Sequence, residues 1–436
     1  MIRLILALAV SFAALPVRAE VDITEVTSPG GITAWLVEEP SIPFVAIEVR
    51  FQGGTSLDLP GKRGAVNLMA GLLDEGAGDL DARAFATARE ALATSFRFNA
   101  SRDSMSISAR FLTENRDEAA ALLRSSLIET RFDSDAIDRV RAQVLSGIKS
   151  AAMDPGDIAA DTFNRLAFGD HPYGSPDTGT EASLAGLTRA DLVEARDRVL
   201  ARDRIYVGAA GDITPDDLGA LLDMIFGDLP AEGAAPITDV DVADGGFVEV
   251  VALDVPQSVA FFGHEGIARD DPDFFAAFVL NEIFGGAGRQ SRLSEEVRER
   301  RGLTYGIGTY LVDFDHASMV LGQFSSANDR IAEAIDVVRA QWARVADTGV
   351  SEDELAAIKT YLTGAYPLRF DGNGPIARIM VGMQMQGLPI DYINTRNDKV
   401  NAVTMEDIRR VATRLYDPDA LRFVVVGQPE GLIATE

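Results

Sequence analysis

The pattern of hydrophobic and polar side chains along the chain predicts both strands and helices. Between Asn99 and Phe111 the two kinds alternate, as in a strand that buries one face. From Asp117 to Thr130 and from Ser134 to Ser150 apolar residues recur at helical spacing, which predicts two helices. The stretch GAVNLMAGLLDEG, residues 64–76, predicts a third helix that packs through its apolar side chains, Val66, Leu68, Met69, Leu72 and Leu73.

One longer pattern occurs twice. Residues 187–211, LTRADLVEARDRVLARDRIYVGAAG, align without a gap with residues 403–427, VTMEDIRRVATRLYDPDALRFVVVG. Each copy predicts a threonine N-cap, an amphipathic helix, a short turn and an apolar strand that ends in glycine. A second pair, GLLDEGAGD near Gly71 and NEIFGGAGR near Asn281, precedes the two copies in the same order. The chain therefore consists of two similar α+β halves.

The segment between the halves has a different composition. Residues 227–246, GDLPAEGAAPITDVDVADGG, are rich in Ala, Gly, Pro and Asp and have no clear period, which predicts an exposed linker. We therefore place an N-terminal half at 20–230, the linker at 231–246 and a C-terminal half at 247–436.

The first nineteen residues predict a secretory signal peptide. Arg3 is followed by an apolar run from Leu4 to Leu15 and then by the small-x-small sequence Val17-Arg18-Ala19, after which cleavage is expected. The run is too short for a spanning helix, although a retained membrane anchor is an open alternative. No later segment approaches eighteen continuous apolar residues. We expect an exported protein, with the periplasm as its compartment and no membrane association after signal removal.

Composition narrows the possible chemistry. The chain of 436 residues is 47% hydrophobic and has 40 Lys and Arg against 67 Asp and Glu, a formal net charge of −27. Such acidity argues against binding to nucleic acid or to anionic membrane surfaces. Cysteine is absent from the sequence, so disulfides and thiolate chemistry are excluded and packed cores must supply the stability.

The three histidines do not form a metal-binding pattern. His171 precedes Pro172 and is predicted to have a structural role in a turn. His264, in GHEG, is predicted at a strand end or in a loop, and His316, after VDFD, at the surface of a strand turn. Without two His at helical spacing or a set of Cys, we expect no catalytic zinc site in this chain.

The layout and several local sequences resemble the pitrilysin, insulinase and mitochondrial-processing-peptidase family of zinc metallopeptidases. The landmarks are FGDHPYGSP, residues 168–176, and GGAGRQSRLSEEVRERRGLTYGIGTY, residues 285–310, of which 291–305 is the most specific part. The resemblance covers nearly the whole chain after the signal sequence. It implies two α+β halves, each a mainly antiparallel sheet with packed helices, that face one another across a cavity.

The resemblance also implies where a zinc site would lie. Catalytic chains of the family carry His-x-x-Glu-His on a helix of the first half, with a later Glu as the remaining ligand. At the matching positions this chain has Asn67, Ala70 and Gly71, and Gly147 best matches the later Glu. Every ligand and the general base are replaced. A glycine within a helix is unfavourable by about 0.5–1 kcal/mol relative to alanine. We therefore interpret this helix as a structural element that packs in the core but lacks the side chains for metal binding and catalysis.

The second half keeps a different part of the family pattern. Catalysis in the family also uses an Arg and a Tyr of the second half that reach the substrate carbonyl, and VRERRGLTY supplies Arg298 and Tyr305 at these positions. A cationic donor and a hydroxyl can both stabilise a developing oxyanion. Gly302 is expected to let the chain turn sharply between them. From the residues alone, the alternative is a solvated Arg298 and a core Tyr305.

A peptide-binding edge is a weaker expectation. In the family frame the strand that contains Asn99, Ala100 and Ser101 is an edge that can pair with an extended peptide, so these three residues are candidate substrate-binding residues. The same sequence, NAS, also fits the N-glycosylation pattern.

Two functions from different classes follow. The first is a non-catalytic subunit of a heterodimeric zinc metallopeptidase, which presents Arg298 and Tyr305 to a homologous partner chain that carries the zinc and to a peptide substrate. In this reading the present chain holds no cofactor of its own. The alternative is a peptide-binding or assembly protein of the same fold without hydrolytic activity.

Overall fold

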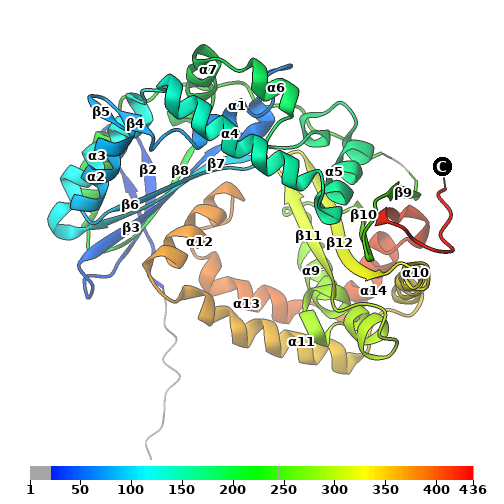
Figure 1. Cartoon of the computed structure of the whole chain (residues 1–436). Coiled ribbons are helices and arrows are strands. Elements are labelled where there is room, and N and C mark those ends of the chain that lie inside the picture. Colours follow the sequence, from blue (N-terminus) through cyan, green and yellow to red (C-terminus); the bar gives the residue numbers. More distant parts are fainter. Residues whose placement is uncertain (1–20, 244, 436) are drawn as a thin grey trace, which may run out of the picture.

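The computed structural model describes residues 21–243 and 245–435, and Figure 1 shows them arranged as two sheet-containing halves. The strands of the first half are β1 (Thr24–Thr27), β2 (Thr33–Glu38), β3 (Phe44–Gln52), β6 (Ser95–Ala100), β7 (Ser104–Leu112) and β8 (Ile205–Gly211), with a small separate hairpin of β4 (Gly76–Ala77) and β5 (Leu80–Asp81). The strands of the second half are β9 (Val248–Ala252), β10 (Gln257–Glu265), β11 (Ile307–Phe314), β12 (Ala317–Ala327) and β13 (Arg422–Gly427).

Helices flank both sheets. Those before the linker are α1 (Ala65–Ala70), α2 (Ala82–Ala91), α3 (Arg116–Ile128), α4 (Ser134–Ala151), α5 (Pro155–Phe168), α6 (Glu181–Gly186), α7 (Arg189–Val199) and α8 (Pro215–Phe226). Those after it are α9 (Phe274–Asn281), α10 (Ile331–Thr348), α11 (Glu352–Ala365), α12 (Asn373–Met385), α13 (Tyr392–Ala402) and α14 (Met405–Leu415). The predicted helices at 117–130 and 134–150 correspond to α3 and α4 and are confirmed.

The two sheets have equivalent strand orders. The first runs β1-β2-β8-β3-β7-β6 and the second runs β9-β13-β10-β12-β11, so that β1 is an additional strand of the first. In each sheet the repeated last strand pairs in parallel with one neighbour, β8 with β2 and β13 with β9, while the other pairings are antiparallel. The prediction of two similar, mainly antiparallel α+β halves is confirmed.

The repeated sequences form the same structure in both halves. Thr188 and Thr404 each cap a helix in a capping box, with Asp191 and Asp407 as the third helical residues. The strands that follow end in glycines whose backbones have φ of 138° and 150°, in the left-handed region. A Cβ at Gly211 would lie 2.2 Å from the Phe44 carbonyl oxygen. The glycine that ends each strand is therefore required by close packing against the neighbouring strand.

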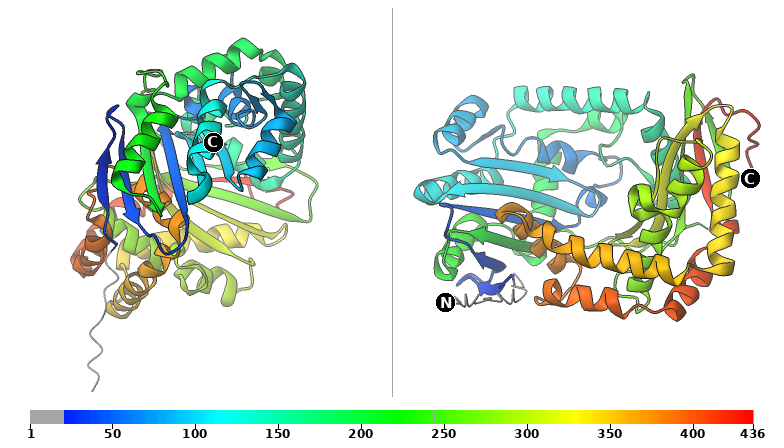
Figure 2. Two further views of the ribbon diagram at one scale, coloured as in Figure 1. Left: turned by 90° about the vertical axis from the view of Figure 1, so that its left-hand side faces the viewer. Right: turned by 90° about the horizontal axis from the view of Figure 1, so that it is seen from below.

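The halves exchange one helix each. Helix α5, from before the linker, packs on the second sheet, where the Phe163 ring lies 5.1 Å from that of Phe261 on β10. Helix α12, from after the linker, packs on β3 and β8 of the first sheet, so closely that a Cβ at Gly208 would lie 2.4 Å from the Ala377 carbonyl oxygen. Figure 1 shows both helices, and Figure 2 (right) shows the sheets at opposite ends of the molecule with the orange helices between them. Besides a main core within each half, two smaller hydrophobic clusters therefore combine residues from both sides of the linker.

One predicted strand is two strands. The segment from Asn99 to Phe111 contains the end of β6, a turn at 101–103 and most of β7. The chain turns there because the carbonyls of the turn accept hydrogen bonds from another segment: the Ser101 oxygen from the Thr55 N–H (2.8 Å) and the Asp103 oxygen from the Gly53 N–H (2.7 Å). The alternation continues through the turn, so that periodicity alone could not reveal it.

The linker is largely exposed, as predicted, but two of its side chains pack against the protein. Residues 231–243 and 245–246 form no helix or strand, as predicted, but Ala234 and Val242 are buried. The Val240 N–H donates to the His316 carbonyl (3.1 Å) and the Ala243 N–H to the Ala167 carbonyl (3.1 Å). Apolar side chains of this segment, whose composition predicted an exposed linker, fill the space between α5 and the second half.

Two features concern membranes. The predicted signal peptide, residues 1–19, lies outside the described residues. Within the described ranges, none of the helices combines the length and the apolar character needed to cross a bilayer.

Candidate functional site

The helix at the emptied zinc motif is short and packed on its apolar side. Helix α1 ends at Ala70, so Gly71 is its C-cap rather than a mid-helix residue as predicted. The Gly71 N–H still bonds to the Asn67 carbonyl (3.2 Å), and the chain then continues in turns. The expected packing is confirmed, because these side chains are all buried: Val66, Leu68, Met69, Leu72 and Leu73.

A buried carboxylate that the sequence did not single out fixes the start of α1. Asp58 accepts hydrogen bonds from the N–H groups of Gly64 (2.7 Å) and Val66 (2.9 Å), and Arg63 lies 3.8 Å away. Burial raises the pKa of Asp58 to about 6, although the two hydrogen bonds and Arg63 act in the opposite direction. The only sequence signal was an Asp just before a glycine-led helix, which is too common to identify such a role.

The residues at the zinc-motif positions do not fit a metal ion. Asn67 is half-buried, Ala70 is buried and Gly71 has no side chain to offer. Gly147 lies on an exposed face of α4, and Val140 of the same helix is the residue that faces Gly71, at 3.0 Å from where a Cβ would stand. Across residues 21–243 and 245–435, His, Cys, Asp and Glu side chains form no group of three or more that could hold a metal ion.

The three histidines have structural surroundings. His171 caps the turn at Pro172–Gly174 by accepting the Tyr173 N–H, which confirms its predicted role. His264 lies near the end of β10, as predicted, where it is buried and accepts the Trp342 indole N–H (3.2 Å). Burial lowers the pKa of both imidazoles.

His316 lies at the turn between β11 and β12, as predicted, but it is only partly exposed. Its side chain is only 15% exposed and bonds to Asp239 of the linker (2.9 Å). Its backbone N–H donates to the Tyr173 hydroxyl (3.2 Å), which in turn donates to Asp103. Burial raises the pKa of Asp103. The histidine therefore contributes to the seam where the two halves and the linker meet.

Arg298 and Tyr305 lie on either side of one turn. Arg298 belongs to a wide helical turn, Ser294–Glu299, and pairs with Glu299 (2.9 Å). Gly302 has φ of 61°, which confirms the expected sharp turn. Tyr305 is 85% exposed, so the alternative of a core residue is wrong. Its neighbour Thr304 is buried, and the Thr304 hydroxyl bonds to both the N–H and the carbonyl of Gly306, so that an ordered turn presents the exposed ring.

The neighbouring arginines of this turn have carboxylate partners nearby. Arg300 contacts Glu295 (2.7 Å) and Glu296 (3.0 Å), and Arg301 contacts Glu296 (2.6 Å). Pairs of this kind at the surface contribute little to stability. These ion pairs do occupy side-chain donors of Arg300 and Arg301, whereas the Tyr305 ring is exposed.

Three adjoining pockets line the space between the halves. One of about 710 Å³ has walls from both, including Arg50 and Ser101 of the first half and Asp313 of the second. A second, of about 540 Å³, shares Asp313 with the first and Tyr310 with a third of about 600 Å³. The third is lined by Gly306 and Gly308, on either side of the start of β11 and next to Tyr305. The shared lining residues thus connect the pockets from the first half to Gly306, the residue after Tyr305.

The candidate peptide-binding residues lie at an edge. Strand β6, which contains Asn99 and Ala100, is the outermost strand of the first sheet, so one side of its backbone has no neighbouring strand. Ser101 follows in the turn, where its N–H bonds to the Ser104 carbonyl (2.8 Å), and it lines the 710 Å³ pocket. The edge position holds, and a substrate-binding role for these residues stays a prediction.

Comparisons with known proteins agree with this fold. The model described as "Insulinase (Peptidase family M16)" matches residues 34–181, and that described as "Peptidase M16 inactive domain" matches residues 186–362. The chain belongs to the M16 peptidase family. A protein named non-peptidase homolog YmxG, from Helicobacter pylori, is 24% identical over 390 residues, which are 89% of this chain and 90% of that protein.

Other M16 relatives carry different names. One called an uncharacterized zinc protease, from Streptomyces coelicolor, is 25% identical over 403 residues, 89% of this chain and 86% of its own length. Among solved structures, a peptidase M16 inactive domain from Pseudomonas fluorescens superposes with a TM-score of 0.87 at 24% identity, over 95% of this chain and 99% of the other. A protease from Helicobacter pylori superposes with a TM-score of 0.84 at 18% identity, over 93% and 99%.

The zinc-motif positions decide which kind of M16 protein this is. Asn67, Ala70 and Gly71 replace the two histidines and the glutamate of the catalytic chains, and the Helicobacter relative is itself named a non-peptidase. This chain is a non-catalytic member of the M16 family.

Proposed function

We propose that this protein is an exported, periplasmic subunit of a heterodimeric M16 metallopeptidase, and that it pairs with a homologous chain that carries the zinc. The observation that carries the proposal is the contrast between two sites. The zinc-motif helix has no ligands, whereas Tyr305 stands 85% exposed on an ordered turn that follows the helical turn of Arg298. An exposed tyrosine ring that nothing in its own chain covers is typical of a contact surface.

The geometry supports a specific contribution to peptide hydrolysis. In the complex, zinc on the partner would activate the attacking water and polarise the substrate carbonyl. Tyr305 would donate its hydroxyl proton in a hydrogen bond to the carbonyl oxygen as that oxygen becomes negative. Arg298 would donate from the other side of the turn once it exchanges Glu299 for substrate. Neither residue forms a covalent bond or transfers a proton.

The substrate would be an extended peptide in the space between the halves. The exposed edge of β6, at Asn99 and Ala100, offers backbone groups that can pair with such a chain. Ser101 continues this edge into the pocket that both halves line. The same features also support the second candidate function, a peptide-binding or assembly protein without hydrolysis, which gives Arg298 and Tyr305 no chemical role.

The test is to identify the partner and then measure catalysis. A pull-down of the mature chain from its own extract should recover an M16 chain with His-x-x-Glu-His. In the reconstituted complex, Tyr305→Phe should lower kcat by roughly 10²–10³, the usual effect of losing one oxyanion donor. Arg298→Ala should lower kcat at least as much, because a cationic donor is stronger. Zinc content and complex formation should not change.

Two matched controls keep the result specific. Tyr361→Phe alters another exposed tyrosine, on α11, and Arg300→Ala alters a neighbouring arginine whose donors are already occupied. Both should leave kcat within about twofold, as expected for surface positions. A Tyr305→Phe complex with full activity would favour the binding or assembly function, as would failure to recover any zinc-bearing M16 chain.

A further inference from the structure

The 540 Å³ pocket is built entirely by the second half and has the size of a ligand site. Its volume lies within the roughly 300–1,000 Å³ range of small-molecule pockets. It is bounded by α9, α12, α13, the turn Tyr366–Phe370 and β11, and Figure 1 labels these three helices and this strand. One part of its wall is apolar and is formed by Phe275, Phe278, Ile379, Met383 and Leu388.

Three arginines form the other part of this wall, namely Arg269, Arg369 and Arg396. Many other arginines of this acidic chain contact carboxylates, as Arg292 does with Glu354 and Arg414 with Asp271. None of the three pocket arginines forms an ion pair with any described residue. In a chain with a formal net charge of −27, a pocket with three cations free of carboxylate contacts is an unusual concentration of positive charge.

Aromatic rings hold two of these arginines in place without neutralising them. The Arg269 guanidinium lies 4.1 Å from the Phe274 ring centre and donates to the Tyr392 hydroxyl. Its Nε is buried and has no hydrogen-bond partner in the described part of the chain. Arg396 is buried, lies 4.6 Å from the Tyr366 ring centre and donates to the Leu362 carbonyl (2.9 Å). The charges are thus fixed in position before any ligand arrives.

The carboxylates that line the pocket do not balance this charge. Asp313 accepts the backbone N–H of Arg269 (3.1 Å) and the Ser318 hydroxyl (2.7 Å). Glu282 makes no ion pair within the described ranges, and burial raises its pKa, although Arg396 and Arg369 lower it. Two fixed cations and the exposed Arg369 therefore face two lining carboxylates, neither of which forms an ion pair with a described guanidinium.

We propose that this pocket binds a peptide carboxylate that lies next to an apolar side chain. The arginines would hold the carboxylate, and the Phe275–Phe278 wall would cover the side chain. An apolar wall and the neighbouring Glu282 both favour a singly charged carboxylate over a phosphate dianion. The carboxylate can come from a peptide C-terminus or from an Asp or Glu side chain.

The pocket wall reaches Tyr310 and Gly286, which also line the pocket beside Tyr305. That this site anchors a substrate of Tyr305 rests on the proposed function, but binding itself does not.

Calorimetric titration of the isolated chain at low salt tests the proposal without a partner or hydrolysis. The probes are acetyl-Ala-Ala-Phe with a free carboxylate and the same peptide as an amide. A second pair, acetyl-Phe-Glu-amide and acetyl-Phe-Gln-amide, carries the charge on a side chain. At least one carboxylate peptide should bind about tenfold or more tightly than its neutral counterpart, and the pair that shows this difference identifies the source of the carboxylate.

Arg369→Gln is the informative variant, because Arg369 is exposed and makes no hydrogen bond or ion pair with other described residues, so its loss should not unfold the protein. It should weaken binding of the preferred carboxylate peptide about tenfold and leave the neutral peptide unchanged. Arg409→Gln, on an exposed face of α14 outside the pocket, is the matched control and should have no effect.

Several results would overturn the proposal. They are equal binding of charged and neutral peptides, no binding of either carboxylate peptide, unchanged binding by Arg369→Gln, or tighter binding of inorganic phosphate than of every peptide. None of these results would bear on the effect of Tyr305→Phe on kcat, which is measured in the complex, so that the two proposals fail separately.

Discussion

The helices α1 and α9 occupy equivalent places in the two halves, since each follows the middle strand of its sheet and precedes the edge hairpin. Their surroundings differ. Around α1 the side chains are packed and apolar, and Gly71 closes on Val140 of α4. After α9 the chain opens into glycine turns, pockets and the exposed Tyr305. The same scaffold is therefore closed by packing in one half and surrounds open pockets with an exposed tyrosine in the other.

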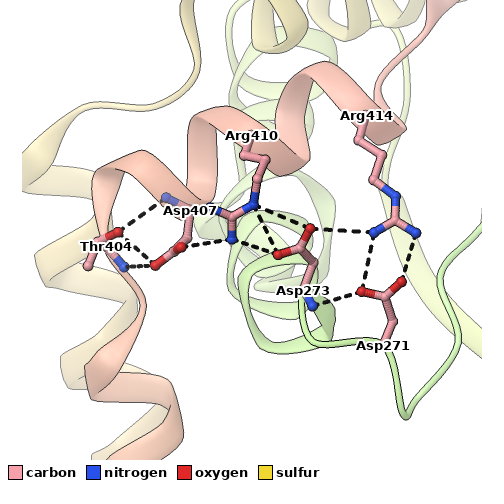
Figure 3. A network of polar contacts seen from close by, with 6 residues as sticks. All are labelled: Asp271, Asp273, Thr404, Asp407, Arg410 and Arg414. Carbon is pink, nitrogen blue, oxygen red and sulfur yellow. Dashed lines mark hydrogen bonds and ion pairs between the residues drawn. The ribbon is translucent and has the colours of Figure 1, made fainter.

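The ion pairs that connect the two repeated helices, α7 and α14, to neighbouring loops also show that the fold is kept while the residue types at equivalent positions differ. On α7, Asp191 and Glu194 hold Lys62, from the loop before α1. On α14, Arg410 and Arg414 hold Asp273 and Asp271, from the loop before α9, as Figure 3 shows. In the alignment of the repeats Glu194 corresponds to Arg410, so the same connection is made with the charges reversed. The two halves share the position of this contact, and the contact can form with the positive charge on either the helix or the loop.

The exchanged helices predict that the halves unfold together. Phe163→Ala removes a fully buried ring of α5 from the second sheet and should lower the free energy of unfolding by about 3–5 kcal/mol. Calorimetry should show a single transition, shifted as a whole, rather than loss of one half. Met153→Ala, at a side chain 70% exposed just before α5, is the control and should change stability little. Two separated transitions in the Phe163 variant would show that the halves are independent.

Rebuilding the zinc motif should disturb the first half without restoring chemistry. Asn67→His, Ala70→Glu and Gly71→His together place a carboxylate at a buried alanine and a ring against Val140. We expect a loss of roughly 2–4 kcal/mol in stability, with weak zinc binding and negligible hydrolysis, because two protein ligands remain where three are usual. Elemental analysis and a peptidase assay check this, with the unaltered chain, expected to hold no stoichiometric zinc, as the reference. Robust hydrolysis would contradict the placement of the missing Glu at Gly147.

Two aspartates in the loops before α1 and α9 should respond to pH in opposite directions. The folded pKa of Asp58 is raised to about 6, so its contribution to stability is fully present below its unfolded pKa of about 4 and is lost as the pH rises through 6. Asp58→Asn should therefore remove a decline of about 2 kcal/mol between pH 4 and pH 7.

Arg414 holds the pKa of Asp271 below its usual value, so its contribution is present above about pH 4 and is lost as the pH falls through the folded pKa. Asp271→Asn should flatten the acid limb of the stability profile. Urea unfolding of both variants from pH 3 to pH 7 measures the two slopes. Parallel profiles for both would mean that the environments of the two carboxylates are equivalent.

The reversed ion pairs should have the smallest effect. Lys62→Ala and Arg410→Ala each remove one partner of an exposed contact and should lower stability only slightly, because exposed ion pairs contribute little. High salt should reduce both effects, because exposed charges are screened. A charge-swapped variant, with Lys62→Glu and Glu194→Lys, should recover most of the loss from Lys62→Glu alone. No recovery would show that polarity at this position is restricted.

The repeated segments could be predicted because their signals are local. Thr188 and Thr404 cap helices through residues three positions away, and the strand-ending glycines are required by immediate neighbours. The turn at 101–103 was missed because its cause is a hydrogen-bond partner near Thr55, far away in sequence. The burial of Val242 within the otherwise exposed linker was missed for the same reason, since this side chain is buried only by contact with other segments.

Some features of the candidate site could also be predicted from the sequence, and others could not. The loss of the zinc ligands could be seen by position alone, at Asn67, Ala70 and Gly71. The exposure of Tyr305 could not, because the residue is apolar enough to suit a core and only the surrounding turn places it in solvent. The pocket arginines Arg269 and Arg396 were not singled out, since they are far apart in the sequence and what marks them is a missing partner rather than a motif.

The exchange of α5 and α12 also sets an order of events during synthesis. When the ribosome has made the whole first sheet, one face of it still lacks α12, which begins only at Asn373. Helix α5, made early, has no sheet to cover until β10 and β13 exist, and β13 is the last strand of the described chain. The two clusters that these helices form are therefore completed only late, and both depend on contacts between distant segments, which form slowly. Late completion of the packing between the halves would suit the proposed export, in which the polypeptide passes through a translocation channel before it folds.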